Sequence, residues 1–114
     1  MEKYIAILKT YKDFLQFLHW NTAKNYAHHL LFERLMGDID DLLDRFVEVS
    51  MGFSGTEQIS YGDFKKQKIE IKDLHLFIMK SKEEFNKLMI ESPETIQNVI
   101  VDILEMFDRH LYLL

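Results

Sequence analysis

The chain has 114 residues, a length typical of one domain, and we expect a single domain over residues 1–114. Its hydrophobic content of 47% is sufficient for a core, and the absence of cysteine excludes disulfides, thiolate metal sites and cysteine nucleophiles. The formal net charge is −5 without any block of lysine or arginine, which argues against direct DNA binding.

The first predicted helix covers residues 2–23. Its apolar residues recur at helical spacing and therefore share one face: Tyr4, Ile7, Leu8, Tyr11, Phe14, Leu15 and Leu18. Charged residues interrupt this stretch, so we expect neither a signal peptide nor a membrane span. Together with the lack of cysteine, this pattern favours a cytoplasmic protein.

Three further helices are predicted, over residues 25–51, 70–90 and 93–113. The second is expected to stop at Gly52. The fourth begins with Ser92-Pro93-Glu94, where Ser92 is expected to cap the helix and Pro93 to take its first position. The predicted fold class is therefore all-α.

The connection between the second and third helices, residues 53–68, is long. Extended, it can reach about 50 Å, whereas a helix of 25 residues is about 38 Å long. The segment can therefore cross the whole bundle, which is a feature of ferritin-like four-helix folds. The alternative is a hairpin loop with an extra helical turn near residues 63–68.

Candidate metal ligands follow one stripe of the second predicted helix: His29, Glu33, Asp40, Asp44 and Glu48. His29 lies four residues before Glu33, and Asp44 lies four before Glu48, so each pair can direct two donor groups at one ion. Mixed imidazole and carboxylate ligation suits iron, and manganese or zinc are also possible. Asp40 is expected to be a surface acid.

The two pairs cannot share an ion within one chain, because Glu33 and Asp44 are about 16 Å apart along the helix axis. They can meet if the second helix of another copy crosses antiparallel near residues 38–39. Gly37 lies beside that point, and a mid-helix glycine costs about 1 kcal/mol relative to alanine, which a close approach of the partner would explain. We therefore expect a homodimer, or a higher homo-oligomer, built through the second helix.

His19 lies near the end of the first predicted helix and, across the hairpin, at the level of His29. Phe17 and Trp20 lie away from the core face, which indicates a surface buried by a partner. His28 falls among apolar positions and is expected to be a core histidine, while His75 and His110 are expected to be structural.

The run from Leu18 to Gly52 resembles the signature region of Dps-like proteins, the mini-ferritins, in its His-Trp pair and in the spacing of its later ligands. The resemblance implies a ferroxidase site shared across a dimer. It assigns His19, His29 and Glu33 to one chain and Asp44 and Glu48 to the other, with Trp20 beside the metal. Small bacteriophage-encoded members are the most similar in size.

Several features depart from that family. Glu33 stands where the family usually has aspartate, the loop before His29 is shorter, and there is neither a lysine-rich tail nor an evident small helix in the crossover. These departures argue against a twelve-subunit cage and against DNA condensation. The alternative function is a non-enzymatic helical dimer, a protein-interaction module that keeps a vestigial metal site.

Overall fold

A computed structural model describes residues 1–56 and 58–114. It contains five helices: α1 (Glu2–Trp20), α2 (Tyr26–Ser54), α3 (Tyr61–Lys66), α4 (Leu74–Glu91) and α5 (Glu94–Leu113). Within these residues there is no strand, so the all-α prediction is confirmed. None of the helices in this part of the chain is long and apolar enough to cross a membrane.

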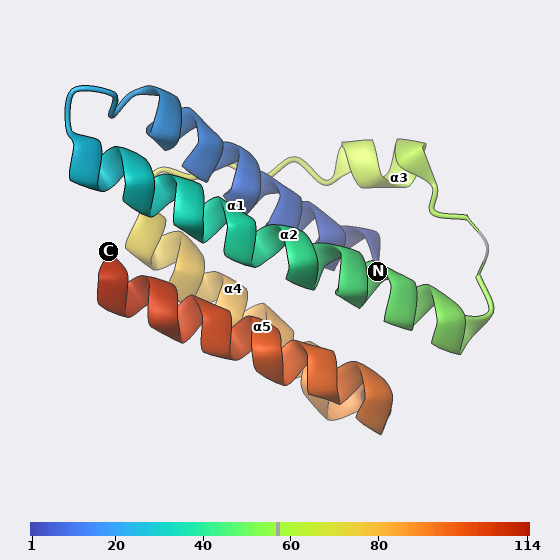
Figure 1. The fold of residues 1–114 in the computed structure, drawn as a ribbon. Coiled ribbons are helices and arrows are strands. Elements are labelled where there is room, and N and C mark those ends of the chain that lie inside the picture. The colour runs from blue at the N-terminus through green and yellow to red at the C-terminus, as the bar shows by residue number, and fades with distance from the viewer. Residues whose placement is uncertain (57) are drawn as a thin grey trace.

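The four long helices form two antiparallel hairpins, α1 with α2 and α4 with α5 (Figure 1). α2 packs against both α1 and α5, and α5 packs against α4. Large side chains from all four helices are fully buried in one core: Leu8, Tyr11, Leu15, Leu35, Ile39, Phe46, Ile78, Phe85, Ile100, Ile103, Met106 and Phe107. Most of the positions that the apolar pattern predicted to be core are therefore buried.

The long connection runs along the bundle instead of turning back at one end (Figure 1). α3 packs beside α1, and Ile69 and Ile71 then line a hollow against Phe14 and Phe17, toward the other end of α1. The Tyr4 ring lies 5.4 Å from that of Phe85 and the Tyr11 ring 6.0 Å from that of Phe77, so α1 and α4 are antiparallel and α4 runs parallel to α2. The predicted crossover path is observed, whereas the ferritin-like assignment stays a prediction.

Five local predictions were wrong. The first helix ends at Trp20, three residues early, because the Asn21 and Thr22 side chains donate to main-chain carbonyls of its last turn. The second continues through Gly52 to Ser54, and the left-handed residue that ends it is Gly55, with φ of 69°.

The other three wrong predictions concern the third predicted helix, the crossover and the last helix. The third predicted helix, α4, begins at Leu74, four residues later than expected, because Asp73 caps it by accepting from the Leu76 N–H. The crossover does contain a small helix, α3, which Ser60 caps by accepting from the Asp63 N–H. Ser92 does not cap the last helix, since its hydroxyl donates to the Leu88 carbonyl at the end of α4. Pro93 itself takes the N-cap position of α5.

Candidate metal centre

His19 and His29 lie together at the α1–α2 turn. Their rings stack with centroids 3.8 Å apart and an interplanar angle of 19°. Nδ1 of each ring lies 2.8 Å from the main-chain oxygen of the other residue. A carbonyl oxygen can only accept, so each Nδ1 must carry the hydrogen. In the neutral imidazoles the lone pair is therefore on Nε2, and among the described residues neither Nε2 has a hydrogen-bond partner.

The turn that creates this pair is held by short-range hydrogen bonds. Asn25 caps α2, since its side chain accepts from the His28 N–H, and its main-chain oxygen accepts from the His29 N–H at 2.9 Å. His29 thus closes the first turn of α2, with its main chain fixed opposite the last turn of α1. Metal-binding histidines usually donate their second ring N–H to a carbonyl or carboxylate, and this pair has that arrangement.

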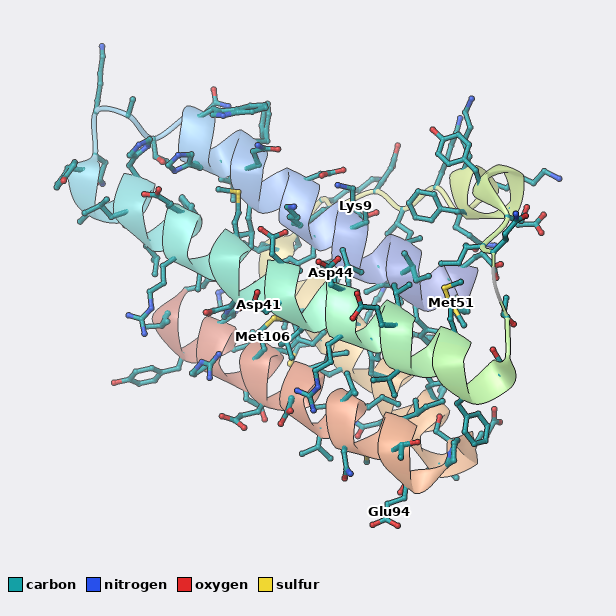
Figure 2. All side chains as sticks on the ribbon, turned by 45° about the vertical axis from the view of Figure 1, so that its right-hand side comes forward. Lys9, Asp41, Asp44, Met51, Glu94 and Met106 are labelled. Carbon is teal, nitrogen blue, oxygen red and sulfur yellow. The ribbon has the colours of Figure 1, made fainter. Side chains whose placement is uncertain are left out.

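The three predicted carboxylate ligands are exposed on the outer face of α2: Glu33, Asp44 and Glu48. Figure 2 shows Asp44 in the middle stretch of α2, well away from the turn that carries the histidines. Within residues 1–56 and 58–114 of one chain, no three histidine or acidic side chains gather closely enough to hold a metal ion. One chain therefore supplies a histidine pair but not a complete site.

The two helix ends that carry the histidine pair also carry exposed apolar side chains. Phe17, Trp20, Tyr26 and Leu30 are all exposed, Trp20 by 65% and Tyr26 by 72%. They come from the last turn of α1 and the first turns of α2, so exposed apolar side chains gather at this end of the bundle.

Gly37 lies on the exposed face of α2. A Cβ built there meets nothing within 4 Å in the described chain. Packing within the chain therefore does not require a glycine at this position.

Other predictions about single residues had mixed outcomes. His28 is not a core histidine: it is exposed, and its Nδ1 lies 3.0 Å from the Asn25 amide, because the apolar face of α2 is not yet covered in its first turn. Asp40 is a surface acid, as expected, and it pairs with Lys12. His75 is exposed at the start of α4 and, among the described residues, makes no hydrogen bond through its side chain.

A second cluster, which sequence reasoning did not find, joins three helices. The Tyr11 hydroxyl lies 2.7 Å from Nδ1 of His110, and Nε2 of His110 lies 2.9 Å from an Asp38 carboxylate oxygen. Tyr11 and His110 are fully buried. Arg109 adds a contact to Asp38 at 3.6 Å. The residues are 72 and 99 positions apart in sequence, so no spacing could indicate that they meet.

Burial controls the protonation of this cluster. It raises the pKa of the Tyr11 phenol, and the charge of Asp38 raises it further. Burial also lowers the pKa of His110 below its ordinary 6.5, against the opposing effect of the hydrogen bond to Asp38; the charges of Arg109 and Arg34 lower it further. At neutral pH, Tyr11 is thus a phenol and His110 a neutral imidazole.

Fold and site together define a small all-α protein with a paired-histidine surface at one end of its bundle. The chain belongs to DUF5856, a family of unknown function whose profile matches residues 19–114. It is similar to an uncharacterized 14.6 kDa protein in the mobD-ri intergenic region of Enterobacteria phage T4. The two are 30% identical over 114 residues, which cover 99% of this chain and 86% of the phage protein. No solved structure matches the chain significantly.

The predicted membership of the Dps-like family is therefore wrong. The family that matches is DUF5856, and neither it nor the phage relative is described as a mini-ferritin or ferritin. The similarity that suggested Dps covered only about a third of the chain, and ligand types at helical spacing can arise on any amphipathic helix. The phage element of that prediction agrees with the relative from phage T4.

Proposed function

We propose that the protein binds a divalent metal ion, iron by preference, at two equivalent sites between two copies of the chain. Each site takes His19, His29 and Glu33 from one chain and Asp44 and Glu48 from the other. The observation that carries the proposal is the reciprocally hydrogen-bonded histidine pair, whose two Nε2 atoms are left to act as ligands.

The register of α2 supports a two-fold arrangement. In an antiparallel crossing centred between Asp38 and Ile39, positions equally far from the centre face each other. His29 then faces Glu48, and Glu33 faces Asp44. The same register brings exposed Tyr26 opposite half-buried Met51, and exposed Leu30 opposite half-buried Val47. Apolar contacts would thus lie near the ends of the interface, and the open position at Gly37 near its middle.

The charge of this α2 face supports a cation between the chains. Within the described residues, four of its acids make no ion pair: Glu33, Asp41, Asp44 and Glu48. Two such faces repel each other when they approach, because like charges are brought together with less water between them. A bound cation at each end of the crossing removes this repulsion, so metal binding and dimer formation should favour each other.

The donor set suits iron, with manganese and zinc as alternatives. Anionic ligands favour the higher charge of Fe(III) over Fe(II), so the same site can support oxidation of bound Fe(II) by oxygen or peroxide, which would make the protein a ferroxidase. The proposed fold is accordingly a ferritin-like bundle, in which the parallel α2 and α4 and the long crossover are the relevant features.

The test is an anaerobic titration of the purified protein with Fe(II), followed by light scattering and by Trp20 fluorescence. Trp20 follows His19 directly, so a metal ion at the pair is expected to quench it. We expect one Fe(II) per chain, quenching that saturates at that ratio, and a dimer with metal bound. A metal-free dimer with unchanged fluorescence would instead favour the protein-interaction module, for which the apolar area around Phe17 and Trp20 is the specific evidence.

A further inference from the structure

Tyr11 is the one residue of the buried cluster whose side chain can undergo one-electron chemistry. Its hydroxyl is 2.7 Å from a nitrogen of His110, and both side chains are fully buried. The proposed metal centre does not use this cluster. Most buried tyrosines satisfy their hydroxyl with one acceptor, whereas here the acceptor is itself bonded to a carboxylate.

The direction of each hydrogen bond follows from the donors available. The Asp38 carboxylate can only accept, so Nε2 of the neutral His110 carries the hydrogen. Nδ1 then bears the lone pair and accepts from the Tyr11 hydroxyl. The phenolic proton therefore already points at a base, and the base already has a carboxylate beside it that would stabilise the imidazolium.

We propose that Tyr11 is a redox-active residue that gives one electron to a strong one-electron oxidant, of the class of small oxygen-centred radicals, while its proton passes to His110. The O–H bond of Tyr11 breaks and an Nδ1–H bond forms on His110. Tyr11 becomes a neutral phenoxyl radical, His110 becomes an imidazolium facing Asp38, and the oxidant gains one electron. A later one-electron reductant restores Tyr11, and the proton returns from His110.

The surroundings suit this role in two ways. The raised pKa of Tyr11 keeps the phenol protonated until it is oxidised, so its proton is still on the hydroxyl and directed at His110 when the electron leaves. The radical would also be shielded from solvent and from other chains, since Phe77 and Phe107 pack around the ring with centroids 6.0 and 5.4 Å away. Exposed Tyr26, Tyr61 and Tyr112 lack such protection.

The experiment is flash photo-oxidation of the metal-free protein by a ruthenium(III) polypyridyl complex, followed by transient absorption and by electron paramagnetic resonance of frozen samples. The signal of Tyr11 is the difference between the unchanged chain and Tyr11→Phe. We expect a phenoxyl radical that outlives those of the exposed tyrosines and has the spectroscopic signature of a hydrogen-bonded phenoxyl. In His110→Gln, whose amide cannot take up the proton, oxidation of Tyr11 should slow by about 100-fold, as when a positioned base is removed.

His28→Gln is the matched control, because His28 is exposed and lies outside the cluster. In this variant Tyr11 should be oxidised at the same rate as in the unchanged chain. If His110→Gln does not fold, Asp38→Asn provides the same test with His110 retained, and a smaller slowing is expected. The proposal is overturned if Tyr11→Phe leaves the radical signal unchanged, or if a folded His110→Gln or Asp38→Asn chain is oxidised at the unchanged rate. Because no metal is used, failure here says nothing against the proposed metal site.

Discussion

His19 and His29 each donate a ring N–H to the main-chain oxygen of the other, at 2.8 Å in both directions. These two hydrogen bonds hold both rings with Nε2 available. Each histidine is therefore both a proposed metal ligand and the residue that orients the other ring. We expect His19→Ala and His29→Ala each to weaken Fe(II) affinity by at least about tenfold, the lower end of what loss of a supporting partner costs. Calorimetric titration measures this, with His28→Ala as the control that should bind normally.

Substitutions at Gly37 should affect the stability of the single chain and the affinity of the dimer in different ways. A Cβ at Gly37 meets nothing within the described chain, so Gly37→Ala should stabilise a single chain by about 1 kcal/mol through helix propensity. Gly37→Leu should nevertheless weaken the dimer, because the larger side chain lies where the partner helix crosses. Gly62→Leu is the control, since Gly62 is an exposed helical glycine of α3, outside the proposed interface. Equal dimer constants for the two leucine variants, by analytical ultracentrifugation, would refute the close approach.

Removal of the Tyr11 hydroxyl should cost stability. Tyr11→Phe leaves Nδ1 of His110 buried without a donor, which costs about 1–3 kcal/mol in the free energy of unfolding. Tyr4→Phe is the matched control: Tyr4 is half-buried against Phe85, and within the described residues its hydroxyl makes no hydrogen bond. Tyr4→Phe should change the free energy of unfolding by no more than about 0.5 kcal/mol. Urea unfolding of the metal-free chains measures both, and a Tyr11→Phe chain as stable as the unchanged one would contradict the expectation.

His110 should make the stability depend on pH in a specific window. Its pKa is lowered in the folded chain from the ordinary 6.5, so the unfolded chain binds more protons just below that value. The contribution of His110 is therefore present above pH 6.5 and is lost as the pH falls through the window down to the folded pKa. The slope from one proton is at most about 1.4 kcal/mol per pH unit. This slope of stability against pH should be absent from His110→Gln when urea unfolding is measured between pH 5 and 7. An equal slope in both chains would show that another group causes the pH dependence.

The sequence allowed the helices, the core faces and the crossover to be predicted, because each depends on local periodicity or on chain length. Some helix ends and caps were predicted wrongly, because a single side chain or glycine determines each of them. Gly52 has no need to stop α2, since Gly55 provides the left-handed residue. Ser92 uses its hydroxyl on the preceding helix, so it could not cap the following one.

The site was predictable in part for the same reason. His19 and His29 meet because a short turn joins their helices, and a hairpin fixes which positions are level. Asp38 and His110 meet because α2 and α5 pack, and packing between distant segments leaves no mark on spacing. The predicted Dps-like family was wrong because ligand spacing on one helix is a weaker indicator than similarity over the whole chain.

The most direct test of the shared metal site is complementation between two inactive variants. His29→Ala and Asp44→Ala should each impair both sites of a homodimer, because each site takes ligands from both chains. In a mixed dimer one site carries both changes and the other carries neither, so about half of the Fe(II) binding per mixed dimer should return, by the symmetry of the dimer. Fe(II) binding measured after unfolding and refolding the two variants together gives the answer. Recovery in the mixture supports the shared site, whereas a mixture that binds no more Fe(II) than either variant alone would contradict it.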